Sequence, residues 1–197
     1  MRSVNIVGFV ILLLGIILPG CARNPPATAQ IPVEGNNAGT AESSTDEKPL
    51  RIGVYDSRAI AVAWAGTSAF TEWMGALEVE YNQAKKANDQ ARIAELEAEA
   101  DARQRKMHTQ AFSTAPVDMI IEFIDDELPA IQRKAGVSML VSKWDQETLS
   151  KYPSAEQVDV TMMLVDAFHP SEKQREFAID VQKRAPISLE EAEKIQD

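Results

Sequence analysis

The stretch that decides the fold begins with SRAIAVAWAGTSAFTEWMGALEVEYNQAKK, residues 57–86, and continues to Ala135. In its first part, large apolar residues recur three, four or six positions apart, at Ile60, Trp64, Phe70, Met74, Leu77 and Tyr81. This spacing is typical of one apolar stripe along an α-helix. The sequence therefore predicts a long helix over residues 57–86.

A short break, Ala87-Asn88-Asp89, follows this helix. Asp89 is a suitable N-cap, because its carboxylate can accept hydrogen bonds from the free backbone N–H groups of the next turn. A second apolar stripe then runs through Ile93, Leu96, Ala100, Met107 and Ala111. Two helices joined by so short a break fold back on each other, so the sequence predicts a coiled-coil hairpin.

The whole hairpin is expected within residues 57–135. Its return limb should bend at the break from Phe112 to Pro116. A further apolar run extends from Val117 to Ile131, and Pro129 within it should kink or break the helix. Gly136 then ends the helical excursion.

Strands are expected on both sides of the hairpin, over residues 51–56 and 137–144, since both segments are rich in strand-forming residues. Residues 147–150 are a candidate third strand. Helices are expected over residues 161–196, where Ser171 with Gln174 and Ser188 with Glu191 have the spacing of capping boxes. The predicted fold class is α+β.

The N-terminal residues have the features of an export signal. Arg2 precedes an apolar run, Val4–Leu18, of the length of a signal-peptide core. The sequence Leu18-Pro19-Gly20-Cys21 resembles the lipobox of bacterial lipoproteins, which implies cleavage after residue 20 and lipid attachment at Cys21. Because no Asp follows Cys21, the resemblance implies delivery to the outer membrane, facing the periplasm. The alternative is an ordinary signal peptide followed by an incidental cysteine.

Residues 22–49 contain almost no large apolar side chains and are rich in Pro, Asn, Thr, Ser and Ala. Such a segment cannot offset its ordering entropy by burial, so residues 21–49 are expected to be a flexible linker after the lipidated cysteine. The remaining residues, 50–197, are expected to form a single domain.

The formal net charge of −10 argues against nucleic acid as a partner, because phosphates select clusters of Lys and Arg. No catalytic pattern is found. The two histidines, His108 and His169, lie far apart and lack metal-ligand spacing, and no phosphate-binding glycine loop is present. We therefore expect a protein that is not an enzyme and that needs no metal or cofactor.

The three tryptophans, Trp64, Trp73 and Trp144, allow two interpretations. They either pack in the core or in a contact between chains, or they form a cage for a ligand; core packing is the default for large aromatic side chains.

The order of these segments is similar to that of the OmpH/Skp family of periplasmic chaperones. The points of contact are Ile52-Gly53-Val54-Tyr55-Asp56-Ser57, the helical excursion, the strand over residues 137–144 and Val158-Asp159-Val160-Thr161 before the closing helices. The resemblance implies a homotrimer with a small antiparallel, β-barrel-like body from which helical hairpins project. It also implies that unfolded outer-membrane proteins are held between the hairpins without ATP.

Two functions are consistent with these features. The first is a lipid-anchored holdase chaperone, for which Lys85, Lys86 and Arg92 near the hairpin tip are candidate client contacts. An ordinary solvated loop is the alternative for these residues. The second function is an adaptor or structural lipoprotein of the envelope that binds folded partners, which the acidic surface favours. The apolar stripe of the hairpin either lines a client cavity or packs within one chain.

Overall fold

The computed structural model of the protein describes residues 49–195. Three strands form one sheet in the order β2-β1-β3, with β1 at Arg51–Tyr55, β2 at Met139–Ser142 and β3 at Glu156–Asp159. The central strand β1 pairs in parallel with both neighbours, so that Ile52 lies beside Met139 on one side and beside Gln157 on the other. Both β2 and β3 are therefore edge strands.

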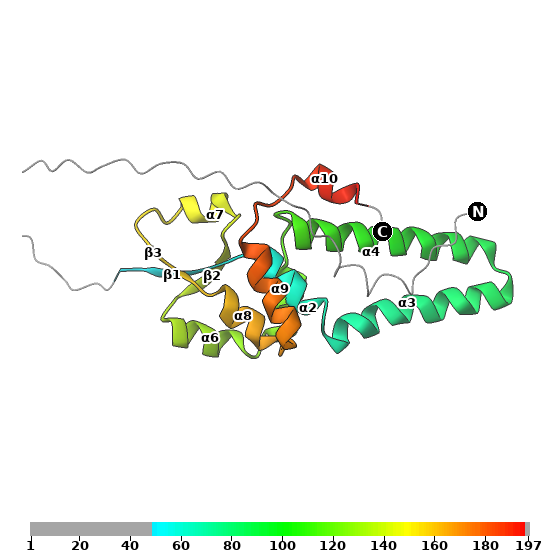
Figure 1. Ribbon diagram of the computed structural model, residues 1–197, viewed down its shortest axis with the longest axis horizontal. Coiled ribbons are helices and arrows are strands. Elements are labelled where there is room, and N and C mark those ends of the chain that lie inside the picture. Colours follow the sequence, from blue (N-terminus) through cyan, green and yellow to red (C-terminus); the bar gives the residue numbers. More distant parts are fainter. Residues whose placement is uncertain (1–48, 196–197) are drawn as a thin grey trace, which may run out of the picture. The chain divides into compact units, whose positions relative to one another are not determined.

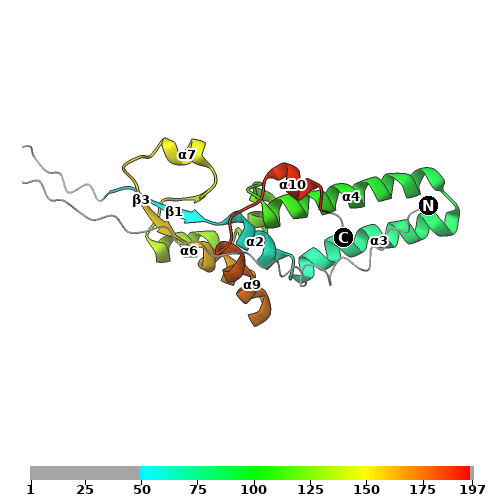
Figure 2. The ribbon, with the colours of Figure 1, turned by 45° about the horizontal axis from the view of Figure 1, so that its top comes forward.

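The prediction of an antiparallel, barrel-like body is wrong. The described chain is mostly helical, and its sheet is small, parallel and open. The reason lies in the connections, because a chain that returns to the same end of a sheet through a helix adds its next strand in parallel. The helical excursion returns the chain from β1 to β2, and a segment containing α7 (Gln146–Ser150) returns it from β2 to β3. Helix α6 (Leu128–Ala135) lies on one side of the sheet and α7 on the other (Figures 1 and 2).

Helix α2 (Ser57–Trp64) leaves the central strand and forms the middle of the core. Its Ala59, Ile60 and Ala63 are fully buried. The helix packs against α4 (Gln90–Phe112), α8 (Thr161–Ala167) and α9 (Glu172–Gln182). The core is thus organised around the segment that directly follows β1.

The expected single helix over residues 57–86 is divided in two. Helix α2 ends at Trp64, and α3 covers Ser68–Ala87. Thr67 causes the division, because its hydroxyl accepts a hydrogen bond from the backbone N–H of Phe70 at 3.1 Å and so caps a new helix. The apolar stripe continues across this break.

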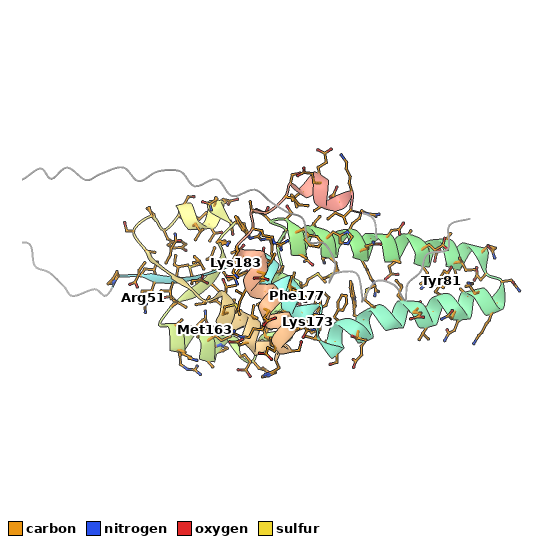
Figure 3. All side chains as sticks on the ribbon, viewed as in Figure 1. Arg51, Tyr81, Met163, Lys173, Phe177 and Lys183 are labelled. Carbon is orange, nitrogen blue, oxygen red and sulfur yellow. The ribbon has the colours of Figure 1, made fainter. Side chains whose placement is uncertain are left out.

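Helices α3 and α4 form the predicted turn and pack against each other (Figure 1). Asn88 adopts the left-handed conformation with φ +56°, and the Asp89 carboxylate caps α4 by accepting from the Arg92 N–H at 3.0 Å. The Tyr81 side chain lies between the two helices and its hydroxyl donates to Glu97 at 3.2 Å (Figure 3). Buried residues on the facing sides are Leu77, Ala84, Leu96 and Ala100. The hairpin stripe is therefore used in packing within one chain.

Most of the predicted breaks and caps after the hairpin are confirmed. Helix α4 ends at Phe112, so the break before Pro116 is confirmed. Pro129 separates two helical pieces, since α5 (Asp118–Ile121) and a 3-10 turn, η2 (Glu122–Ile124), precede it and α6 begins beside it. Both capping boxes are present, at the start of α9 and of α10 (Leu189–Glu193). The candidate strand over residues 147–150 is wrong, because the Asp145 carboxylate caps α7 there.

The signal peptide, residues 1–20, and Cys21 with most of its linker lie outside the described residues. Within residues 49–195, no helix has the length and apolar composition needed to cross a membrane.

Candidate functional site

The carboxyl ends of the three parallel strands meet at one edge of the sheet, where α/β proteins commonly bind ligands. Asp56 follows β1 directly, Lys143 and Trp144 follow β2, and Thr161 follows β3 by two residues. The Thr161 hydroxyl accepts a hydrogen bond from the Asp56 N–H at 3.0 Å, and the Thr161 N–H donates to Asp159 at 2.8 Å. The first bond joins the end of β1 to the segment after β3, and the second is local to the end of β3.

The Asp56 carboxylate is fully buried and accepts hydrogen bonds from several donors. Its Oδ1 accepts from the backbone N–H and the Nε of Arg58, both at 3.1 Å, and from the Trp144 indole N–H at 3.3 Å. Its Oδ2 accepts from Arg58 Nη2 at 2.8 Å and from Lys143 Nζ at 2.7 Å. Burial acts to raise the pKa of Asp56, but the hydrogen bonds and charges of Arg58 and Lys143 outweigh it and hold the pKa below its ordinary value.

This arrangement makes Asp56 a structural centre. The ionised carboxylate has donors on both oxygens, and the Arg58 side chain is only 1% exposed. Arg58 also donates from Nη1 to the carbonyl oxygen of Arg184 at 2.9 Å. Because Arg58 and Lys143 are already paired with Asp56, we assign these three residues a structural role: they hold the surrounding segments together.

Trp144 is fixed by the same centre. Asp56 accepts its indole N–H, the Arg58 guanidinium carbon lies 5.1 Å from the ring centroid, and Lys143 Nζ lies 4.7 Å from it. Cations at this distance from an indole ring are attracted to its π face. Trp144 is therefore held in place as a wall of the neighbouring groove.

A groove with a volume of about 350 Å³ lies beside β2. All of the strand residues, Met139, Leu140, Val141 and Ser142, line it. Successive side chains of a strand point to opposite faces, so only the edge of the strand can present all of them to one groove. The groove therefore follows the edge of β2 that does not pair with β1.

The opposite wall is the segment between α4 and α5, which contributes Thr114, Pro116, Val117 and Asp118. Val117 is buried, and the Gln110 side chain donates to the carbonyl oxygen of Pro116 at 2.8 Å. These contacts hold the wall at its place. The remaining lining residues, at the carboxyl end of the sheet, are Tyr55, Trp144, Asp145 and Thr148.

Tyr55 contributes a polar group to this end of the groove. Its side chain is buried, with 6% exposure, and its hydroxyl forms no hydrogen bond with any residue in the described part of the chain. Burial raises the pKa of Tyr55 to about 12, and the carboxylates of Asp118 and Asp145 add to this shift. The hydroxyl is therefore neutral, and it lies close enough to the Asp118 and Asp145 carboxylates to interact with their charges.

The charged residues that line the groove are acidic. Asp118 is exposed in the first turn of α5, and Asp145 is exposed at the cap of α7. The Thr148 N–H donates to Asp145 Oδ1 at 2.9 Å, and this bond lowers the pKa of Asp145. The end of the groove thus combines a buried phenol, an indole and two exposed carboxylates.

The structure places the predicted tip residues apart from this groove, at the far end of the hairpin. Lys85 and Lys86 are exposed in the last turn of α3. Arg92 is paired with Glu80 and, at 3.0 Å, with Glu95. The charge of Arg92 is therefore balanced locally. Cys21 lies outside the described residues.

The tryptophans divide between the two interpretations. Trp64 packs against Phe70 and Trp73 at ring distances of 5.0 and 5.5 Å, which confirms the core interpretation for Trp64. Trp144 instead lines the groove. Sequence reasoning missed the group of Tyr55, Asp118 and Asp145, because an antiparallel sheet would put the ends of the first two strands at opposite edges.

Among residues 49–195, no group of three or more His, Cys, Asp and Glu side chains is arranged to hold a metal ion. Comparison of the chain with protein-family models, with curated proteins and with solved structures finds no match.

Proposed function

We propose that the protein is an adaptor of the bacterial cell envelope whose body binds an extended segment of a partner protein along the free edge of β2. The observation that carries this proposal is the groove, which all residues of β2 line at their unpaired edge. An edge strand has unpaired backbone N–H and C=O groups, and an added strand satisfies them. The lipobox-like sequence ending at Cys21 supports attachment of this body to a membrane.

The two edges of the sheet differ in their suitability. The free edge of β2 carries Met139, Leu140 and Val141 and is bordered by a groove. The edge at β3 has exposed Glu156 and Asp159, and Arg51 pairs with Glu156 across the sheet at 3.1 Å. Short, charged edges resist strand addition. The edge of β2 is therefore the better docking surface.

The holdase chaperone stays an untested prediction, and the hairpin favours the adaptor over it. Leu77 is 2% exposed and Leu96 is 1% exposed, because each packs on the opposite helix of the same hairpin. The stripe that a chaperone would present to unfolded clients is thus taken up within one chain.

Crosslinking in cells tests the proposal. A photoreactive residue in place of Thr148, which lines the groove, should capture one or two recurrent partners in the full-length protein. A matched probe in place of the exposed Gln83 on α3 should not capture them. Many unfolded outer-membrane proteins captured at Gln83, together with delayed precipitation of such a protein by the purified chain, would support the holdase instead.

A second variant tests whether the partner pairs with the strand edge. The Ser138 N–H donates to Arg51 of β1, and successive N–H groups of a strand alternate in direction, so the Met139 N–H points away from β1. Met139→Pro removes that outward donor at the first residue of the strand, where proline is tolerated. In this variant, the crosslink from the probe at position 148 to the recurrent partners should be lost. An unchanged crosslink would mean that the partner does not bind as a strand.

A further inference from the structure

We infer that the carboxyl end of the groove, formed by Tyr55, Asp118, Asp145 and Trp144, is a binding pocket for the primary ammonium group of a lysine on the partner segment. This inference rests on the proposed function, because it identifies the chemistry of the segment that binds along β2. The pocket would select a basic segment and set its register on the strand.

Charge is the first argument. The charged residues lining the groove, Asp118 and Asp145, are both acidic. Neither takes part in an ion pair within the described part of the chain. Of the neighbouring cations, Lys151 pairs with Glu147 at 3.1 Å and Lys143 pairs with Asp56 at 2.7 Å. The carboxylates are therefore available to a cation that comes from outside.

The buried phenol is the second argument. Tyr55 lies on the central strand, lines the groove and has a hydroxyl that no described residue hydrogen-bonds. The Tyr55 side chain is nine-tenths buried, but its hydroxyl oxygen is not enclosed by protein, so the hydroxyl opens into the groove and is accessible to a group that a ligand supplies. It can accept a hydrogen bond from an ammonium N–H.

The number and placement of the acceptors favour lysine. An ammonium group has three N–H donors that diverge from one point, and the pocket offers three separate acceptors on three elements: Tyr55, Asp118 and Asp145. Arginine instead prefers a single carboxylate that it can meet with two parallel hydrogen bonds. Asp145 Oδ1 also accepts the Thr148 N–H that caps α7.

The pocket also accommodates the lysine stem. Trp144 is fixed by Asp56 and presents an indole surface on which methylene groups can pack. A strand added at the edge of β2 would place alternate side chains toward the same face. A lysine beside Ser142, the last residue of β2, would therefore reach this end of the groove.

Peptide binding to the full-length protein tests the inference. The probe is a fluorescein-labelled, amidated peptide, Thr-Val-Thr-Lys-Val-Thr, followed by anisotropy, and its matched versions carry norleucine, arginine or glutamate in place of lysine. We expect the lysine peptide to bind at least about tenfold more tightly than the norleucine peptide, since a charge-assisted hydrogen bond is among the stronger polar contacts.

Variants of the pocket sharpen the test. Asp118→Asn and Tyr55→Phe should each reduce the preference for lysine over norleucine several-fold. Asp125→Asn is the control, because Asp125 is an exposed carboxylate on the same stretch of chain that does not line the groove. It should leave the preference intact.

The outcomes separate the inference from the proposed function. Equal binding of the lysine and norleucine peptides, or of the lysine and arginine peptides, would overturn the lysine pocket and leave strand addition standing. If no peptide binds, or if Met139→Pro breaks a dimer of this chain, strand addition by a partner fails as well. Butylammonium that binds as tightly as the lysine peptide would identify a site for small amines and also overturn the inference.

Discussion

Asp56 and Arg58 form an ion pair away from water, since their side chains are 0% and 1% exposed. We predict that Arg58→Met lowers the free energy of unfolding by about 3–5 kcal/mol, because it leaves a buried carboxylate with Lys143 as its remaining cation. Urea unfolding followed by circular dichroism measures this change.

The exposed pair of Arg175 with Asp166 is the control for this prediction. Its side chains are 44% and 50% exposed, and the two charges lie 2.7 Å apart. Arg175→Met should cost less than about 1 kcal/mol, because water already solvates both charges. Similar losses in the two variants would show that Asp56 does not depend on Arg58.

The same carboxylate should make stability depend on acid. The pKa of Asp56 in the folded protein lies below its ordinary value of 3.8, so below that value the unfolded chain binds the proton more readily. The contribution of Asp56 is therefore complete above the ordinary pKa and is lost as the pH falls through the folded-state pKa. Urea midpoints measured from about pH 5 to about pH 2 should fall with acid, and Asp56→Asn should make that fall shallower. An identical acid dependence in the variant would contradict this assignment.

At the scale of the elements, we predict that alanine has opposite effects on stability at two glycine positions, Gly53 and Gly75. A Cβ on Gly53 in β1 would lie 2.8 Å from Leu140 Cδ2 and 3.1 Å from Val137 Cγ2, so Gly53→Ala should destabilise the protein by about 1–3 kcal/mol. A Cβ on Gly75 in α3 would meet nothing within 4 Å, and alanine is the better helix former. Gly75→Ala should therefore stabilise by up to about 1 kcal/mol. Thermal unfolding of the two variants measures both changes in stability. A stabilising Gly53→Ala would mean that β1 and β2 are not packed this closely.

Local signals in the sequence predicted local structure well. Asp89 and Ser171 cap their helices as their spacing indicates, because a cap needs only the next turn of backbone. The direction of the strands depends on where a long excursion returns, and no local pattern carries that information. The groove was missed for the same reason, since Tyr55 and Asp118 come together only when β1 and β2 run in parallel.

At the scale of the whole molecule, we expect the purified protein to be a monomer. The buried residues of the sheet and of its covering helices, such as Ile52 at 1% and Leu164 at 0% exposure, are enclosed within one chain. A core completed in this way does not need a second copy to exclude water. Light scattering on the purified protein measures the mass, and a trimeric mass would contradict this expectation and support the chaperone.

The contacts near the C-terminal end of the described chain have a consequence for the order of events in folding. Arg58 donates to the carbonyl oxygen of Arg184, and Ser113 donates to that of Ile187 at 2.7 Å. Because a chain is synthesised from its N-terminus, the partners of Arg58 and Ser113 are made 126 and 74 residues after them. The hydrogen bonds of the Arg58 side chain therefore cannot be completed until Arg184 has been translated. A chain whose core closes so late remains competent, for most of its synthesis, for any transport step that requires an unfolded polypeptide.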